Sequence, residues 1–332
     1  MADLRTSAAL EEAKKRMESL LECKPEVIAC DLHPQYFTTR FAENSGLPML
    51  QIQHHWAHIL SCMAENNWGR EPVIGISFDG TGYGTDGTIW GGEILHCTWN
   101  RFDRIASVTP FKQAGGDASS REGWRIALAL LRDMDADRAK ETASVLQLCS
   151  QPEMQILSVM LEKNINCIPS TSAGRLFDAA SAILGLVKKS TFEGEAAMAL
   201  QFAALRYTGE VLQLCSPEEL VSDGEIMRLR TDLLFRNLVR AKLHGEDSAM
   251  LAKAFHRTLA DMIAAACRKY REKSGIHCCA LSGGVFQNTL LLEEVTVRLE
   301  KDGFTVLRHS QVPPNDGGIA LGQAAAAMEI SR

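Results

Sequence analysis

Two apolar runs that end in glycine turns constrain the fold of this chain more than any other feature. Residues 72–78 run into Asp79-Gly-Thr-Gly-Tyr-Gly84, and residues 277–281 run into Ser282-Gly-Gly284. A buried strand followed by a glycine turn is typical of α/β proteins, which present ligands at the carboxyl ends of their strands. Alternating residues at 88–108 predict strands or a hairpin, and helical spacing recurs at 121–160, 176–186, 195–211 and 250–273. The pattern predicts two α/β lobes with mixed sheets, joined through a helical middle and separated by a cleft.

Composition narrows the class of protein. The chain has 332 residues, 46% of them hydrophobic, which is enough for one large or two medium domains. A net charge of −6 argues against a polynucleotide partner as the first hypothesis. Ten cysteines without a Cys-x-x-Cys pair are typical of buried free thiols in a reducing compartment. Residues 1–25 read as a charged helix and no apolar run reaches the ~18 residues of a membrane span, so we expect a cytoplasmic protein.

A candidate metal site combines two histidines with two aspartates. His54 and His58 are four residues apart, so on a helix both imidazoles project from one face while His55 points away. Asp79 and Asp316 each stand beside a glycine turn where a strand ends. Two imidazoles and two carboxylates suit zinc or ferrous iron. Two alternatives remain open, namely that the histidines are an ordinary surface pair and that Asp316 only caps its helix.

The glycine turns also predict a site for phosphate groups, because backbone amides can approach phosphate oxygens where no Cβ intervenes. Gly174 and Asp178 open a central helix, where Asp178 could accept hydrogen bonds from a ribose or only stabilise the helix dipole. Gly115-Gly116-Asp117 with Arg121 and Arg125 is a weaker candidate for an anion site. Three further histidines in apolar surroundings are expected to be core or edge residues: His256, His277 and His309.

The motifs together resemble a known family. They are Asp31-Leu-His-Pro-Gln-Tyr, Gln53-His-His-Trp-Ala-His58, Phe78-Asp-Gly-Thr-Gly-Tyr-Gly84, Trp90-Gly-Gly-Glu93, Ser172-Ala-Gly-Arg-Leu-Phe-Asp178, Leu281-Ser-Gly-Gly-Val-Phe-Gln-Asn288 and Asn315-Asp-Gly-Gly318. In this order they resemble the carboxyl-terminal domain of HypF, the carbamoyltransferase family of nickel–iron hydrogenase maturation. More distantly the chain is similar to the TsaD family of tRNA threonylcarbamoyl transferases and to antibiotic O-carbamoyltransferases. The resemblance implies a two-lobed actin-like ATPase (ASKHA) fold, with a first lobe over residues 1–120 and a helix-rich second lobe over 121–332 whose last helix returns to the first.

The resemblance also implies functional residues and partners. His54, His58, Asp79 and Asp316 match the family's metal ligands. The positions that would line ATP, carbamoyl-adenylate or the AMP product are Gly80, Thr81, Gly82, Gly174, Asp178, Gly194, Gly283, Gly284 and Asn288. In the family, an acylphosphatase domain hydrolyses carbamoyl phosphate and a YrdC-like domain makes carbamoyl-adenylate. The domain resembled here passes the carbamoyl group to the carboxyl-terminal cysteine of HypE, and the product becomes a cyanide ligand of the hydrogenase iron.

The chain departs from the full family pattern. The acylphosphatase domain, the Cys-x-x-Cys zinc fingers and the YrdC-like domain are missing, and the sequence begins as if inside the actin-like domain. We therefore expect a first lobe without its opening strands, with an exposed sheet edge that favours a homodimer. No residue is assigned as general base. O-carbamoylation or threonylcarbamoylation of another acceptor remains an alternative, although Met198 stands where the tRNA branch is expected to carry a glutamate; a fragment that only binds nucleotide or a partner is another.

Overall fold

A nine-stranded mixed sheet forms the centre of the molecule, in the order β11-β10-β3-β4-β5-β9-β8, with β7 joining β4 and β6 beside it. The structure, a computed structural model, describes residues 4–331. The strands are β3 (Val73–Tyr83), β4 (Ile89–Cys97), β5 (Phe102–Val108), β6 (Phe111–Ala114), β7 (Cys167–Ser170), β8 (Val221–Ser222), β9 (Met227–Leu229), β10 (Cys278–Ser282) and β11 (Thr305–Leu307). Strands β11, β10 and β3 are parallel, whereas β3, β4 and β5 are antiparallel. The prediction of a mixed sheet is confirmed.

The sequence pattern had indicated that β3 ends at the glycine turn, but the strand continues through it. It continues to Tyr83, and its pairing with β4 is irregular between Phe78 and Gly82. A bulge of this kind bends a strand and re-aims its side chains, and bulges are frequent beside functional sites. Asp79 therefore projects from a distorted part of a strand rather than from a loop.

Strand β10 brings the second glycine turn to the same edge as the first. Ser282 pairs with Ser77 in parallel register, so the residues that follow both strands lie side by side. Gly283 has φ +101°, and a Cβ there would overlap the backbone of Phe78. Only glycine fits this approach, because other residues rarely adopt such a φ and their Cβ would need the same space.

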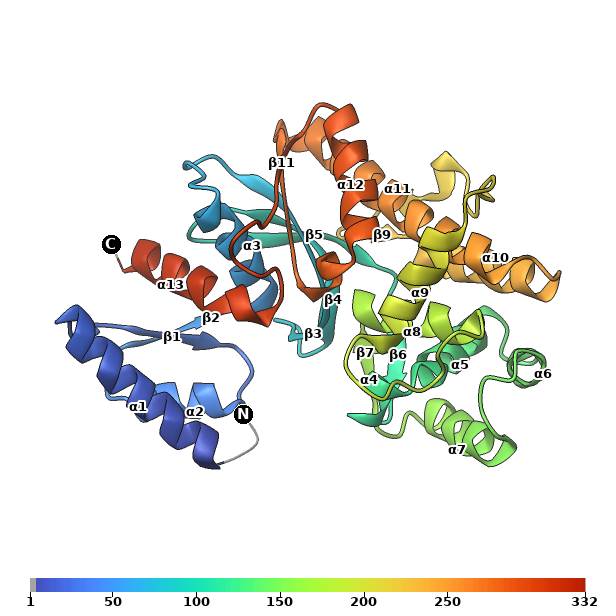
Figure 1. Cartoon of the computed structure of the whole chain (residues 1–332), viewed down its shortest axis with the longest axis horizontal. Helices are drawn as coiled ribbons and strands as arrows, with labels where there is room; N and C mark the ends of the chain where they lie inside the picture. The colour runs from blue at the N-terminus through green and yellow to red at the C-terminus, as the bar shows by residue number, and fades with distance from the viewer. Residues whose placement is uncertain (1–3, 332) are drawn as a thin grey trace.

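A separate two-stranded sheet lies beside the first helix. It pairs β1 (Ile28–Asp31) with β2 (Met49–Ile52) in parallel and is accompanied by α1 (Leu4–Leu21) and α2 (Phe37–Glu43). In Figure 1 these blue elements sit next to the red helix α13 (Ile319–Ile330), which contacts both strands. Segments from the two ends of the described chain thus pack together.

Helix α13 also packs closely against α3 (His54–Glu65). A Cβ on Gly322 would overlap the carbonyl oxygen of Ala57 and lie 3.0 Å from the amide of Ser61. Small residues at this crossing let the two backbones meet, and they explain the glycine- and alanine-rich sequence of α13. Ala57 lies between the two candidate metal ligands of α3, so this packing fixes the helix that carries them.

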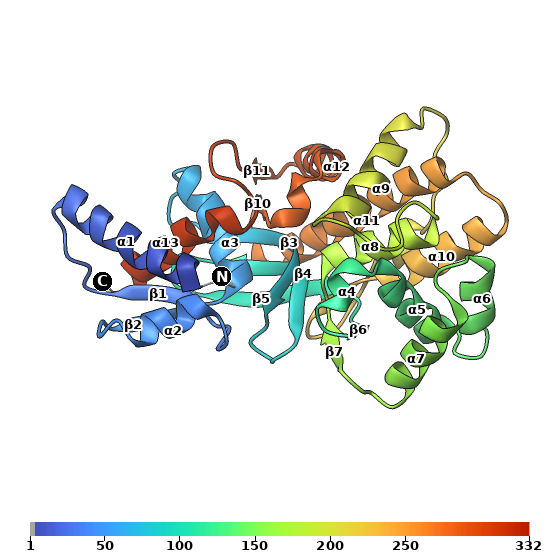
Figure 2. The same ribbon diagram turned by 60° about the horizontal axis from the view of Figure 1, so that its bottom comes forward.

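The remaining helices form the other half of the molecule, as Figure 2 shows. They are α4 (Ala118–Arg121), α5 (Gly123–Met134), α6 (Ala139–Val145), α7 (Gln151–Glu162), α8 (Ala173–Ile183), α9 (Glu195–Arg206), α10 (Thr231–Leu243), α11 (Ser248–Ser274) and α12 (Thr289–Lys301). Their core contains Phe177, Phe235 and Phe255, whose rings meet edge to face. Within residues 4–331, no helix is both long enough and apolar enough to cross a membrane.

The predicted helical middle is therefore present, and α10 is a helix that the sequence pattern had not indicated. All ten cysteines are free thiols, and most of them are buried, as expected. The division into lobes at residue 120 stays a prediction; strands from both sides of that residue share the central sheet.

Candidate metal centre and adjoining cavity

Helix α3 begins at the candidate ligands themselves. Gln53 caps it by accepting a hydrogen bond from the amide of Trp56, so His54 occupies the first turn and His58 the second. Both imidazoles are almost fully buried. The buried start of α3 lies near the carboxyl-terminal part of β3 and next to the turn that follows β10, so both histidines face this region.

The four predicted metal ligands come together in the structure. One donor atom from each of His54, His58, Asp79 and Asp316 lies within 4.8 Å of all the others. Asp79 Oδ2 is 3.1 Å from His54 Nε2 and 3.5 Å from His58 Nε2, and Asp316 Oδ1 is 3.6 Å from both nitrogens. The histidine pair is therefore buried within this cluster, and the alternative of an ordinary surface pair is excluded.

Asp316 does not cap a helix, which excludes the second alternative. The cap of the short 3-10 turn η3 (Asp316–Gly318) is Asn315, whose side chain accepts from the amide of Gly317. The Asp316 side chain is 75% exposed and turns toward the two histidines. Its carboxylate remains available to a ligand.

The spacing of the donor atoms fits a metal ion. Two ligands each about 2.1 Å from a tetrahedral ion lie about 3.4 Å apart, close to the separations between these four side chains. The buried Nε2 of His58 lies 3.5 Å from Asp79 Oδ2 and 3.6 Å from Asp316 Oδ1, and it makes no hydrogen bond of ordinary geometry within the described residues. A buried nitrogen without such a bond is costly, and a cation between the four groups would satisfy it. The donor set of two nitrogens and two oxygens suits zinc or iron.

A fifth residue, Asp31, completes the arrangement and escaped the sequence analysis. It is the last residue of β1, and its Oδ2 accepts a hydrogen bond of 3.0 Å from His54 Nδ1. This bond turns His54 Nε2 toward Asp79, which is how a carboxylate commonly orients a metal-binding histidine. The sequence analysis gave the Asp31-Leu-His-Pro motif as part of the family resemblance and assigned Asp31 no role at the metal site. Its partner is far along the chain, so no local spacing indicated the role.

Protonation in the metal-free chain follows from these contacts. Burial lowers the pKa of His54, but its hydrogen bonds to Asp31 and Asp79 outweigh burial and raise the pKa to about 10. Asp316 and Asp79 likewise outweigh burial and raise the pKa of His58. Burial favours the neutral acid of Asp79, yet the two histidines hold its pKa well below the usual range. The carboxylates thus stabilise positive charge at this point, as a proton or as a cation.

The glycines of the turns serve close packing around this cluster. A Cβ on Gly82 would overlap the ring of His55 and lie 2.8 Å from His54 Cδ2. The amide of Gly284 donates to Asp79 Oδ1 at 3.1 Å, which orients the carboxylate. These two glycines therefore shape the candidate metal centre as well as the predicted phosphate site.

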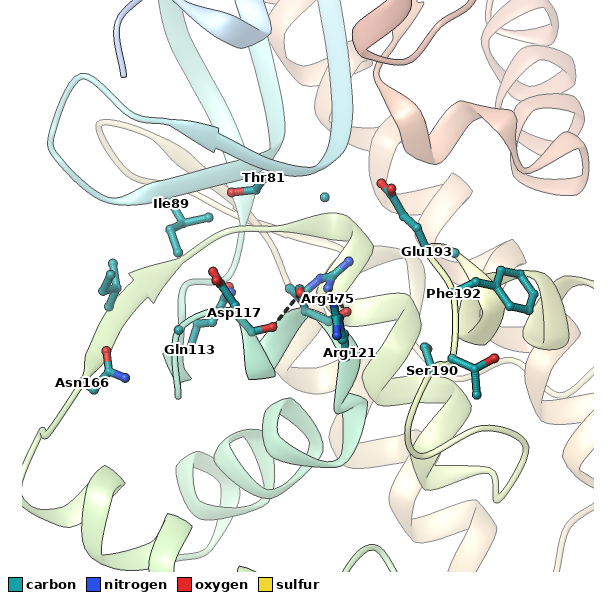
Figure 3. Close-up of a pocket in the computed structure, with 16 residues that line it drawn as sticks. Thr81, Ile89, Gln113, Asp117, Arg121, Asn166, Arg175, Ser190, Phe192 and Glu193 are labelled. Carbon is teal, nitrogen blue, oxygen red and sulfur yellow. Dashed lines mark hydrogen bonds between the residues drawn. The ribbon is translucent and has the colours of Figure 1, made fainter. Parts of the chain in front are cut away.

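A cavity of about 690 Å³ opens beside the first glycine turn. Gly80 and Thr81 form one wall, the N-terminal turn of α8 with Arg175 forms the floor, and the loop that ends at Gly194 forms another wall (Figure 3). Gly174 packs on Gly80, where a Cβ would lie 2.9 Å from the Gly80 Cα. Three of the predicted nucleotide residues, Gly80, Thr81 and Gly194, line this cavity directly.

Most of the loop that was the weaker candidate for an anion site also lines this cavity. Gly116, Asp117 and Arg121 line it together with Asn166 and Gln113 (Figure 3). Arg125 does not; its guanidinium instead pairs with Glu122 at 2.6 Å. The sequence had indicated this loop without indicating that it faces the first glycine turn.

Two predicted nucleotide residues have partners within the protein. Asp178 lies 3.2 Å from Arg175, and burial raises its pKa to about 6 despite that arginine. Asn288 caps α12 by accepting from the amide of Leu291, and its amide group contacts His256 Nε2 at 2.9 Å. Both residues are buried, and neither lines the cavity of Figure 3.

The three histidines that were expected to be core or edge residues differ from one another. His256 is a core residue, and burial lowers its pKa to about 4. His277 is exposed just before β10, at the edge of the fold. His309 instead hydrogen-bonds to Glu65 and Ser282, two polar residues to which the sequence analysis gave no role.

Comparisons with known proteins agree with this architecture. Residues 1–65 match the family described as the HypF Kae1-like domain, and residues 75–323 match the one described as carbamoyltransferase, Kae1-like domain, second subdomain. Carbamoyltransferase HypF of Synechocystis sp. is 37% identical over 96% of this chain and 42% of its own length. A carbamoyltransferase HypF homolog of Cupriavidus necator is 34% identical over 97% of this chain and 83% of its own length.

A solved structure of full-length HypF in a phosphate- and nucleotide-bound form has the same fold. It superposes with a TM-score of 0.89 at 35% identity, over 96% of this chain and 41% of that one. The mixed sheet, its flanking helices and a site at the strand ends define an actin-like (ASKHA) α/β protein, as predicted. The chain belongs to the HypF carbamoyltransferase family and corresponds to its carboxyl-terminal, Kae1-like domain. It spans about 42% of the length of the Synechocystis relative.

Proposed function

We propose that this chain transfers a carbamoyl group from carbamoyl-adenylate to the carboxyl-terminal cysteine of a HypE-like acceptor. The cysteine sulfur would form a bond to the carbamoyl carbon while the bond from that carbon to the phosphate oxygen breaks, and AMP would leave. Its membership of a family of carbamoyltransferases supports this reaction class. Carbamoyl-adenylate, formed from carbamoyl phosphate and ATP, would come from acylphosphatase and YrdC-like domains acting in trans. The observation that carries the proposal is the cluster of His54, His58, Asp79 and Asp316 beside two glycine turns.

We propose zinc or ferrous iron as the resident metal. The separations among the four donor atoms support this choice, as does the buried Nε2 of His58, which makes no ordinary hydrogen bond within the described residues. When bound, the ion would act as a Lewis acid toward an oxygen of the adenylate. Asp31 would hold His54 in the orientation that binding requires, and Gly284 would hold Asp79.

The adenylate is proposed to lie between the two glycine turns, with Gly80, Thr81, Gly82, Gly174, Gly194, Gly283 and Gly284 near its phosphate and ribose. The phosphate- and nucleotide-bound state of the HypF relative supports a nucleotide here. Asp178 and Asn288 would support this site from behind, since both are buried and bonded to neighbouring residues. Arg121 and Arg175 line the adjoining cavity, where they would favour the ionised form of an incoming thiol.

The direct test supplies the metal-loaded chain with carbamoyl-adenylate and a HypE-like acceptor. We expect the intact mass of the acceptor to increase by one carbamoyl group, and an acceptor lacking its terminal cysteine should remain unmodified. His58→Ala should bind no stoichiometric metal and transfer nothing. Transfer to an alcohol or to tRNA instead of the cysteine would favour the alternative carbamoyltransferases. Nucleotide binding without transfer to any acceptor would indicate a binding fragment.

A further inference from the structure

Three polar side chains from distant segments form a continuous chain of hydrogen bonds behind the metal cluster. His309 follows β11, and its Nδ1 lies 2.7 Å from Glu65 Oε2 in the last turn of α3. Its Nε2 lies 2.8 Å from the hydroxyl of Ser282, the last residue of β10. The side chains of His309 and Glu65 are only 4% and 7% exposed, and Ser282 is fully buried. The three groups therefore satisfy one another while mostly shielded from solvent.

The direction of these bonds is fixed by Glu65. An ionised carboxylate only accepts, so His309 Nδ1 carries a proton. Burial lowers the pKa of His309, so the ring is neutral and its Nε2 accepts from the Ser282 hydroxyl. Burial opposes ionisation of Glu65, but the amides of Gln311 and Ser310, with His309, lower its pKa to about 2. The order of groups is that of a serine hydrolase triad, yet Ser282 is closed to solvent and no substrate can reach it. The arrangement joins segments and does not attack a substrate.

The segment that begins at His309 leads to Asp316. Glu65 Oε1 accepts from the amide of Ser310 at 2.7 Å and from that of Gln311 at 2.5 Å. Beyond them, the amide of Gly283, next to Ser282, donates to the carbonyl of Pro314 at 2.9 Å. Residues 309–314 are thus fastened to both α3 and the end of β10. Because the Asp316 side chain is 75% exposed, the backbone before it, rather than burial, sets its position.

Helix α3 carries both the ligands and this anchor. Glu65 follows His58 by two helical turns, so the two side chains share a face of the helix. Any shift of α3 relative to residues 309–314 would therefore change the separation between the histidines and Asp316. We propose that Glu65, through His309 and Ser282, is a positioning residue that sets Asp316 as a metal ligand. This inference rests on the proposed metal site and is independent of the carbamoyl acceptor.

Cobalt(II) is the probe for the test, because its visible absorption reports the number and geometry of its ligands. We expect Glu65→Gln to weaken cobalt binding about 10- to 100-fold, the usual effect of losing a group that orients a ligand. Its spectrum should shift toward that of Asp316→Asn. Glu71→Gln is the matched control: Glu71 is exposed beyond the end of α3 and outside these hydrogen bonds, so affinity and spectrum should stay unchanged.

A double-mutant cycle separates positioning from a general loss of structure. If Glu65 acts through Asp316, Glu65→Gln in the Asp316→Asn background should weaken cobalt binding less than twofold further. Ser282→Ala removes one hydroxyl and should give a smaller loss of affinity in the same direction, which keeps the test valid if Glu65→Gln unfolds. Two outcomes would overturn the positioning role and leave the metal site itself in place. One is that the losses of affinity caused by Glu65→Gln and Asp316→Asn multiply in the double variant. The other is that Glu65→Gln and Ser282→Ala both bind cobalt as tightly as the unaltered chain. If the unaltered chain bound no cobalt, the metal site and this role would both be wrong.

Discussion

His54 is held between two carboxylates, and this single side chain determines much of how the candidate metal centre behaves. Its Nδ1 bonds to Asp31 and its Nε2 to Asp79. Without a metal, both ring nitrogens carry protons, because a carboxylate only accepts. With a metal, Nε2 must lose its proton while the bond to Asp31 persists. In the proposed metal site Asp31 would therefore orient His54, whereas Asp79 would bind the ion.

The first prediction concerns Asp31. Asp31→Asn keeps the size of the side chain but replaces the charged acceptor of His54, so we expect zinc affinity to fall about 10- to 100-fold. A competition titration with a chromogenic chelator measures the change. Asp117→Asn, in the adjoining cavity, serves as the control and should leave zinc affinity unchanged. Unaltered affinity in Asp31→Asn would show that the bond to His54 does not orient it.

The second prediction concerns pH. Because His54 keeps its proton in the metal-free chain up to its pKa of about 10, zinc binding must release that proton at pH 7. Affinity should therefore rise about tenfold per pH unit for each proton released. The paired His54 stabilises the metal-free fold fully below about pH 6.5, and this contribution is lost as pH rises through about 10. Calorimetry at pH 7 in buffers of different ionisation enthalpy counts the protons; no proton release would contradict this protonation state.

The spacing of residues predicted part of the site and not the rest. His54 and His58 share a helix, and Asp79 follows a recognisable strand, so local periodicity was enough to select them. Asp31, Glu65 and His309 act across long separations in sequence, and their environment exists only after folding. An isolated histidine in an apolar context reads as a core residue, which is why His309 was assigned to the core or an edge.

At the scale of elements, the crossing of α13 over α3 determines where the histidines lie. Gly322 allows the two helices to touch at Ala57, between His54 and His58. The alanine-rich sequence of α13 is typical of a helix. It could not predict this contact, since helix periodicity does not specify a partner. The sequence around Asp79 also did not predict that β3 continues past Phe78, because glycines usually interrupt strands.

The third prediction tests this crossing. Gly322→Ala introduces a methyl group that overlaps the Ala57 carbonyl, so the helices must separate. We expect the free energy of unfolding to fall by about 1–3 kcal/mol, the usual cost of overpacking, together with weaker zinc binding. Denaturant unfolding and zinc titration provide the two measurements. Gly69→Ala is a matched control, because a Cβ there meets nothing within 4 Å, and its stability should change little.

At the scale of the whole molecule, the candidate metal centre brings together parts of the fold that lie far apart in the sequence. Its ligands come from α3, from the bulge of β3 and from the turn before α13. Asp31 adds the small sheet of β1 and β2. A bound ion would therefore cross-link the central sheet, the helix on its face and the end of the described chain.

The fourth prediction follows from this cross-link. Zinc at a free concentration of 100 times its dissociation constant should stabilise the fold by about 2.7 kcal/mol, provided that it does not bind the unfolded chain. Chelation should then lower the melting temperature measured by scanning calorimetry. His58→Ala should melt at the same temperature with and without chelator. If chelation left the melting temperature of the unaltered chain unchanged, a bound ion would not cross-link the fold.

Strand β10 lies between β3 and β11 in the central sheet, and Cys279 pairs with Ile74 from a remote part of the sequence. Closing so long a loop is slow, because its entropy is lost before the contact is gained. A chain emerging from the ribosome would thus carry His54, His58 and Asp79 well before β10 reaches its place and Asp316 arrives. The four candidate ligands therefore come together only in a chain whose two described ends have already met.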